Sequence, residues 1–142
     1  MAILGVDQVS VAVLDLDDAT RIYQDILGLR ATHDETVEDQ GVKTRFFPLP
    51  GKMTTVEALV GLGPETPVGK FLAKRGPGVH HIAFRVDNLR AELARLKGKG
   101  VQLIDQEPRR GAEGKMIAFI HPKETGGVLI ELCELPHGGQ AH

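Results

Sequence analysis

The sequence predicts an α+β fold of two tandem βαβββ modules whose strands form a curved mixed sheet. An internal repeat carries this prediction: residues 78–89 match residues 5–16, 73 positions earlier, at glycine, valine and leucine positions and in their apolar alternation. Residues 129–133 correspond to residues 55–59, 74 positions earlier, and the two segments share a glutamate. An amphipathic helix pattern follows the first strand of each copy. The chain is therefore expected to contain one plan of strands and helix written twice.

The first module begins with a strand and a helix. Apolar side chains alternate with others along 4–13, which is the period-two pattern of a half-buried strand. A helix is expected over 17–28, because Asp15 or Asp17 can cap its start and Gly28 can end it. The apolar stripe of this helix consists of Ala19, Ile22, Tyr23, Ile26 and Leu27.

The other elements follow from apolar runs that turn-forming residues separate. Three more strands of the first module are expected at 30–37, 42–49 and 53–61. A linker at 63–77 carries a short helix at about 68–74. The second module is expected to have a strand at 79–86, a helix at 88–98, and strands at 101–105, 115–120 and 127–133. The modules thus span about 4–62 and 78–134 of a single domain, 1–142, with a frayed tail at 135–142.

Composition and charge exclude several classes of function. The chain has 42% hydrophobic and 25% charged residues, which is typical of a soluble globular protein. A net charge of -2 with scattered lysines and arginines argues against nucleic acid as a partner. No apolar run is long enough to cross a membrane, and the single cysteine, Cys133, excludes an internal disulfide. We expect a cytoplasmic protein with a small-molecule ligand.

Four polar residues occupy repeated positions in the two modules. Gln8 corresponds to His81, and Glu57 corresponds to Glu131. Strand parity puts these side chains on faces that do not pack against the helices, so a curved sheet would bring them together. One imidazole and three oxygens could hold an octahedral divalent ion with two open positions. Each residue alone is more often solvated or structural, but a glutamate that recurs in an apolar strand indicates a shared role.

Two segments carry a resemblance to a known family. Residues 78–87 (GVHHIAFRVD) and 121–132 (HPKETGGVLIEL) resemble the methylmalonyl-CoA epimerases of the vicinal oxygen chelate superfamily. The resemblance implies an isomerase that interconverts (R)- and (S)-methylmalonyl-CoA through an enediolate. It also implies a homodimer and a bound divalent ion, Co²⁺ first and Zn²⁺, Ni²⁺ or Mn²⁺ as alternatives. The expected ligands are Gln8, Glu57, His81 and Glu131, with glutamine where the epimerases usually have histidine.

The same resemblance suggests roles in catalysis. Glu131 matches a residue that acts as a base, while the position of the second base is Thr44, whose hydroxyl cannot serve. Glu57, or a water molecule near Thr44, is therefore expected to take that role. Cations that could meet the substrate carboxylate or the coenzyme A phosphates are Arg85, Lys115 and Lys123, and Thr44 completes the expected substrate contacts.

Two other functions remain open from the sequence. Gln8 is also compatible with a glyoxalase I-type lactoylglutathione lyase, although the loop before Glu131 favours the epimerase. A metal-free small-molecule-binding protein of the same fold would have little use for Glu57, His81 and Glu131 together. A ring-cleaving dioxygenase normally needs two histidines and one carboxylate, so Gln8 argues against it.

Overall fold

The alternating pattern at the start of the chain forms β1 (Ile3–Ala12), as predicted. The computed structural model describes residues 3–136, so most of the predicted tail, 137–142, lies outside the described residues. Within this range the chain divides into two units. One consists of residues 8–80, and the other combines residues 3–7 with 81–136. Each end of β1 therefore belongs to a different unit.

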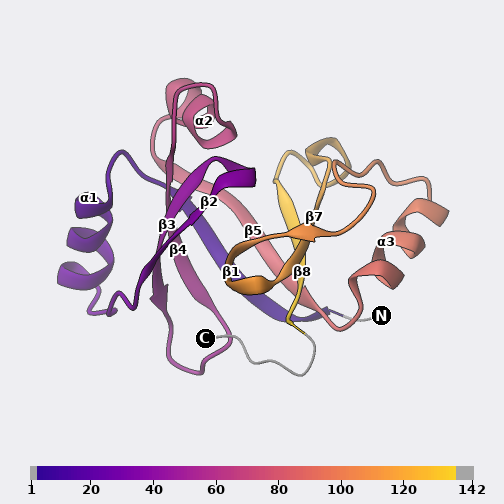
Figure 1. Cartoon of the computed structure of the whole chain (residues 1–142), viewed down its shortest axis with the longest axis horizontal. Helices are drawn as coiled ribbons and strands as arrows, with labels where there is room; N and C mark the ends of the chain where they lie inside the picture. The colour runs from indigo at the N-terminus through magenta and orange to yellow at the C-terminus, as the bar shows by residue number, and fades with distance from the viewer. Residues whose placement is uncertain (1–2, 137–142) are drawn as a thin grey trace. The chain divides into compact units, whose positions relative to one another are not determined.

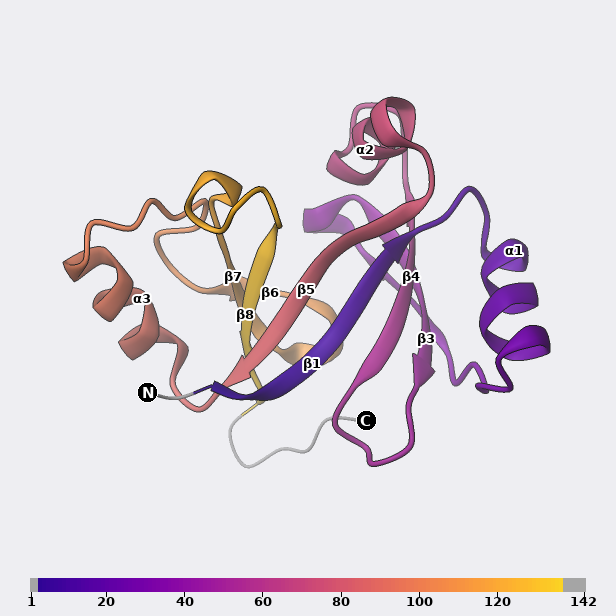
Figure 2. The ribbon, with the colours of Figure 1, turned by 180° about the vertical axis from the view of Figure 1, so that it is seen from behind.

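The unit of residues 8–80 contains the remaining strands of the first predicted module. They are β2 (Asp34–Val37), β3 (Val42–Pro48) and β4 (Thr55–Gly61). Their order is β2-β3-β4-β1, with β4 antiparallel to β3 and parallel to β1. Figure 2 shows β4 between β1 and β3. Parallel and antiparallel pairs thus occur together, as the predicted mixed sheet requires. A 3-10 helical turn at Glu38–Gln40 joins β2 to β3.

The predicted first helix is present, but it changes from an α-helix to a π-helix along its length. Asp15 caps α1 (Leu16–Thr20) by accepting a hydrogen bond from the Asp18 backbone N–H at 2.7 Å. A π-helical turn follows at Arg21–Ile26, where Leu27 N–H donates to the Ile22 carbonyl. This i→i+5 bond adds a residue to the turn and shifts the apolar stripe. Consequently the predicted stripe is wrong at its end: Ile26 and Leu27 are 64% and 61% exposed.

Residues of the predicted linker form α2 (Pro67–Arg75), close to the expected short helix. Thr66 caps this helix, and its Oγ1 accepts a hydrogen bond from the Gly69 N–H at 3.1 Å. Val68 is buried on the helix and packs in a cluster with Ala12, Val42 and Leu59. The helix thereby covers apolar surface of β1, β3 and β4 within its own unit.

The second module repeats the plan with β5 (Gly78–Val86), which enters the other unit at His81, followed by α3 (Leu89–Gly98), β7 (Met116–Ile120) and β8 (Ile130–Glu134). The remaining strand is β6 (Arg109–Arg110), and 3-10 turns lie at Ala112–Gly114 and Pro122–Glu124. The strand predicted at 101–105 is wrong, because that stretch makes only an isolated bridge from Leu103 to Ile120. Leu103 is nevertheless buried, so the apolar run reflects core packing rather than a strand.

One face of this second unit packs against α3. Leu89 and Leu93 of the helix join Val86, Ala118 and Leu132 of the strands in one buried cluster, and Figure 1 shows α3 on that side of β7 and β8. The opposite strand face carries the predicted site residues His81 and Glu131. The fold is thus α+β with two βαβββ modules, as predicted. No helix in residues 3–136 is long and apolar enough to span a membrane.

Candidate functional site

Strand register reproduces the internal repeat at the predicted site residues. In the first module, Glu57 on β4 pairs with Ser10 on β1, two residues after Gln8. In the second module, Glu131 on β8 pairs with Ala83 on β5, two residues after His81. In each unit, therefore, the glutamate pairs with the residue that lies two positions after the other predicted ligand, Gln8 or His81. Both glutamates are buried, which is unusual for a carboxylate without a specific role.

His81 and Glu131 form a buried pair. The His81 Nε2 lies 3.0 Å from Glu131 Oε1, and the two side chains are 4% and 3% exposed. The Phe119 ring meets the imidazole edge-on, with ring centroids 5.2 Å apart and an interplanar angle of 81°. Phe119 is also the β7 partner of Glu131 in the strand register. One aromatic ring thus orients the imidazole beside the carboxylate.

Gln8 and Glu57 occupy the equivalent places in the other unit. Gln8 is buried, and its Nε2 donates to Ser10 Oγ at 3.3 Å, so Oε1 is the ligand atom that it could offer to a cation. Glu57 on β4 has two strand partners. Ser10 on β1 is one of them, and Phe46 on β3 is the other. Phe46 therefore stands beside Glu57 as Phe119 stands beside Glu131.

The donor types fit a divalent cation. One unit supplies a buried amide oxygen and a carboxylate, and the other supplies a buried imidazole and a carboxylate. Hard or borderline divalent ions bind ligands of these types. Within residues 3–136 no three histidine, cysteine, aspartate or glutamate side chains gather closely enough to hold an ion by themselves. His81 and Glu131 are brought together in one unit, while Gln8 and Glu57 belong to the other.

Two of the predicted substrate contacts are instead ion-paired to a buried aspartate. Arg85 Nε and Nη2 donate to Asp7 Oδ1 at 2.9 and 2.6 Å, and Lys115 Nζ donates to Asp7 Oδ2 at 2.7 Å. The Asp7 side chain is 0% exposed, and those of Arg85 and Lys115 are 12% and 6% exposed. Glu113 Oε1 lies 3.6 Å from Lys115 Nζ. These two cations therefore already have buried counter-charges, which weakens the prediction that they bind a substrate anion.

The other two predicted substrate contacts, Thr44 and Lys123, belong to different units. Thr44 is buried on β3, opposite Leu59 of β4 and Glu35 of β2. Its parity matches that of Phe46, so it shares the strand face of Glu57. Lys123 is exposed in the 3-10 turn at Pro122–Glu124, where its backbone N–H donates to His121 Nδ1. Thr44 thus belongs to the candidate site within its unit, while Lys123 lies on the surface.

Sequence reasoning missed the residues that surround the predicted ones. Asp7 escaped it because its partners lie 78 and 108 residues away. Phe119 falls within the strand predicted at 115–120, and Arg109 falls between that strand and the one predicted at 101–105. A repeat-based signal for Phe119 exists, since Phe46 holds the equivalent place beside Glu57.

Cys133 is a buried thiol in the same unit, on the face of Glu131. Burial, followed by the charges of Asp7 and Glu131, raises the pKa of the Cys133 thiol well above its ordinary value. We therefore expect no reaction with a thiol reagent such as DTNB at pH 8 in the native protein, and one thiol per chain after unfolding in guanidinium chloride. Rapid reaction of the native protein would contradict this burial.

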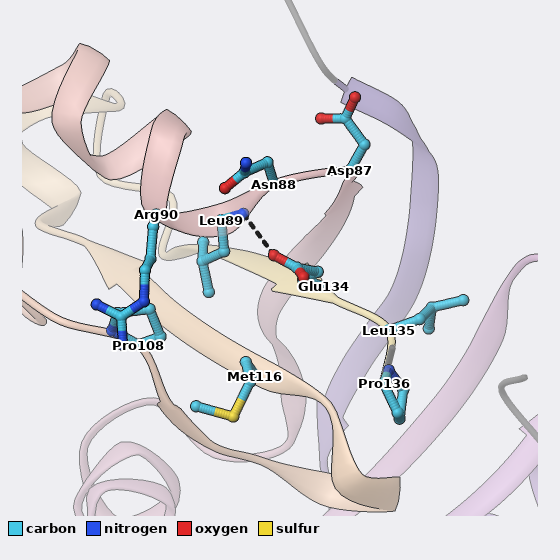
Figure 3. Close-up of a pocket in the computed structure, with 9 residues that line it drawn as sticks. All are labelled: Asp87, Asn88, Leu89, Arg90, Pro108, Met116, Glu134, Leu135 and Pro136. Atoms are coloured by element: carbon cyan, nitrogen blue, oxygen red, sulfur yellow. Dashed lines mark hydrogen bonds between the residues drawn. The ribbon is translucent and has the colours of Figure 1, made fainter. Parts of the chain in front are cut away.

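A pocket of about 480 Å³ lies away from the candidate site. Figure 3 shows it at the start of α3, where Glu134 Oε1 accepts the Leu89 N–H at 2.7 Å and Met116 is among the lining residues. Glu134 and Met116 have the opposite strand parity to Glu131 and Ile117. The pocket is therefore on the helix-covered face, opposite His81 and Glu131.

Comparison with known proteins identifies the family of the chain. Residues 7–119 match the model of the glyoxalase/bleomycin resistance protein/dioxygenase superfamily. The chain is 38% identical to the ethylmalonyl-CoA/methylmalonyl-CoA epimerase of Cereibacter sphaeroides over 128 residues, which cover 89% of this chain and 94% of that one.

Solved structures point the same way. A methylmalonyl-CoA epimerase from Mycobacterium tuberculosis has a TM-score of 0.91 and 41% identity, covering 95% of this chain and 90% of that one. A methylmalonyl-CoA epimerase in complex with methylmalonyl-CoA and NH4+ has a TM-score of 0.90 and 36% identity, covering 94% and 96%. The chain therefore belongs to the glyoxalase/bleomycin resistance protein/dioxygenase superfamily and, within it, to the methylmalonyl-CoA epimerases, a family of isomerases.

Proposed function

We propose that this chain is a metal-dependent epimerase that interconverts (R)- and (S)-methylmalonyl-CoA. The observation that carries the proposal is the repeated buried glutamate, Glu57 in one module and Glu131 in the other, each in the same register beside an aromatic residue. Epimerisation needs a proton to leave one face of the α-carbon and another to arrive on the opposite face. Two equivalent carboxylates suit that requirement.

In the proposed reaction, one glutamate takes the α-proton and the conjugate acid of the other returns a proton from the opposite side. The electron pair of the broken C–H bond passes into the thioester carbonyl and comes back when the new C–H bond forms, so nothing is oxidised or reduced. Glu131 takes one base role, and its Oε1 lies 3.0 Å from His81 Nε2. Glu57 takes the other.

We propose Gln8, Glu57, His81 and Glu131 as the ligands of a divalent ion, with Co²⁺ as the first choice. A bound ion of this kind would supply Lewis acidity for the negative charge that develops on two substrate oxygens. Burial of all four side chains supports the proposal, because a carboxylate and an imidazole removed from water gain most from a cation. Glutamine at position 8 keeps an oxygen donor in that set.

The second base is the least constrained part of the mechanism. Thr44 has no basic group, but Glu35 is its strand partner on β2. A Glu35→Gln variant is therefore the appropriate comparison for Glu57→Gln. If Glu57→Gln loses proton transfer on one face of the α-carbon and Glu35→Gln does not, Glu57 is supported as the second base. If Glu35→Gln shows this loss and Glu57→Gln does not, the base role moves to Glu35.

The substrate class in this proposal is a small acyl-CoA thioester. We also propose a cytoplasmic location, which one reduced cysteine suits, and a homodimer, which size-exclusion chromatography with light scattering would test. No nucleic-acid or membrane partner enters the proposal.

The proposed function is tested by incubating the Co²⁺-loaded protein with one epimer of methylmalonyl-CoA and separating the two intact CoA thioesters, which are diastereomers, by chromatography. We expect both epimers to reach equal amounts, with no change in the metal-free control beyond the uncatalysed rate. A parallel assay offers the hemithioacetal of methylglyoxal and glutathione. Formation of lactoylglutathione without epimerisation would replace the proposal with the glyoxalase I-type lyase.

A further inference from the structure

We propose that Arg109 is a substrate-binding residue that receives an anionic group of the acyl-CoA, in the role that the sequence suggested for Arg85 and Lys115. This inference rests on the proposed function for the identity of its ligand. It starts from a difference between three cations of one unit. Arg85 and Lys115 are hydrogen-bonded to Asp7, with side chains only 12% and 6% exposed, whereas the Arg109 side chain is 35% exposed.

A tight hairpin places Arg109 on the strand face of the candidate site. Arg109 of β6 pairs with Ile117 of β7, and Ile117 packs with Ala83 and Phe119 on that face. The Gly111 N–H donates to the Lys115 carbonyl at 2.9 Å and closes the hairpin. A side chain at Gly111 would meet Ile117 Cγ2 at 2.8 Å, so the close approach of the two strands requires glycine.

Two contacts hold the guanidinium in position. Its Nε lies 3.0 Å from Asp105 Oδ1, while Asp105 Oδ2 accepts the Phe119 backbone N–H at 2.8 Å. Its Cζ lies 5.6 Å from the centroid of the Phe119 ring, at the distance of a cation–π contact. Because Phe119 also contacts His81, a single ring separates Arg109 from the His81–Glu131 pair.

The guanidinium keeps its anion-binding edge available. Within residues 3–136 the acidic partner of Arg109 is Asp105, through Nε, and no other side chain is hydrogen-bonded to its two Nη atoms. A guanidinium that is ion-paired at Nε and packed against a ring presents these atoms as a planar fork, which matches two oxygens of a carboxylate or a phosphate. Such preorganisation lowers the entropic cost of binding, because the long side chain is already ordered.

An acyl-CoA of the malonyl type offers this fork two kinds of anion, the acyl carboxylate and the coenzyme phosphates. Three ligands separate them in calorimetric titrations of the Co²⁺-loaded full chain. Malonyl-CoA carries both groups, acetyl-CoA carries only the phosphates, and malonyl-pantetheine carries only the carboxylate. None of the three changes its configuration during the titration.

We expect Arg109→Gln to weaken malonyl-CoA binding by about tenfold to a hundredfold, the size of one charge-assisted bidentate contact. A parallel loss for malonyl-pantetheine assigns the contact to the carboxylate, and a parallel loss for acetyl-CoA assigns it to the phosphates. Arg109→Lys keeps the charge and loses the fork, so it should bind between wild type and Arg109→Gln. The lysine variant decides the question if the glutamine variant does not fold.

The matched control is Arg110→Gln, the same change at the next residue, on the opposite face of β6. Unchanged affinity in Arg110→Gln together with the loss in Arg109→Gln supports the assignment. Wild-type affinity of both Arg109 variants for all three ligands would overturn it, and so would equal losses at positions 109 and 110. If the wild-type protein binds none of the ligands, the proposed function itself fails, which is a separate result.

Discussion

Replacing Glu131 with glutamine is expected to lower kcat/KM for methylmalonyl-CoA by about 10²-fold to 10⁴-fold, the usual contribution of one general base. The amide retains an oxygen in place of the carboxylate but cannot accept the α-proton. It also loses the charge that faces His81 Nε2 at 3.0 Å. Initial rates with a single epimer, at matched Co²⁺ content, provide the measurement.

Glu134→Gln is the control for that experiment. Glu134 lies on the same strand as Glu131 but on the opposite face, where it accepts the Leu89 N–H. A glutamine oxygen can accept the same hydrogen bond, so we expect activity close to that of the wild type. Equal activity of Glu131→Gln and the wild type would remove Glu131 from catalysis.

Replacing Asp7 with asparagine is expected to lower the free energy of unfolding by about 3–5 kcal/mol, the typical cost of removing one partner from a buried ion pair. Arg85 and Lys115 would keep their positive charges in a largely buried site, with Glu113 as a nearby carboxylate. Urea denaturation followed by circular dichroism measures the change, provided that the m-value stays constant.

A solvent-exposed ion pair gives the comparison. Arg90 and Glu107 lie 2.8 Å apart with side chains 72% and 70% exposed, so Glu107→Gln should change stability by less than about 1 kcal/mol. An Asp7→Asn protein as stable as the Glu107→Gln protein would show that the buried cluster adapts to the lost charge. The ion pairs of Asp7 would then contribute little to the stability of the unit.

The sequence could predict the strand positions of the candidate site residues because the repeat acts as an internal alignment. Gln8 and His81 occupy the same place in β1 and β5, and the register of Glu57 and Glu131 on their neighbouring strands is identical. Period-two parity was sufficient to assign their faces, since a strand side chain has only two choices. The fold class followed from the same repeat.

Local patterns failed where backbone geometry or distant partners decide the outcome. The stripe ending in Ile26 and Leu27 assumed 3.6 residues per turn, and the π-helical turn at Arg21–Ile26 changes that period. The apolar run at 101–105 packs without strand pairing beyond one bridge. The partners of Asp7 are distant in sequence, so the engagement of Arg85 and Lys115 could not be read locally.

The most direct test of the two-glutamate mechanism is solvent exchange at the α-carbon, followed by NMR in D2O with each pure epimer. The wild-type protein should exchange the α-proton of both epimers and interconvert them. Glu57→Gln, which retains an oxygen ligand but loses a base, should exchange one epimer only and should not interconvert the two. Two-sided exchange with full epimerisation by Glu57→Gln would contradict the assignment of Glu57 as the second base.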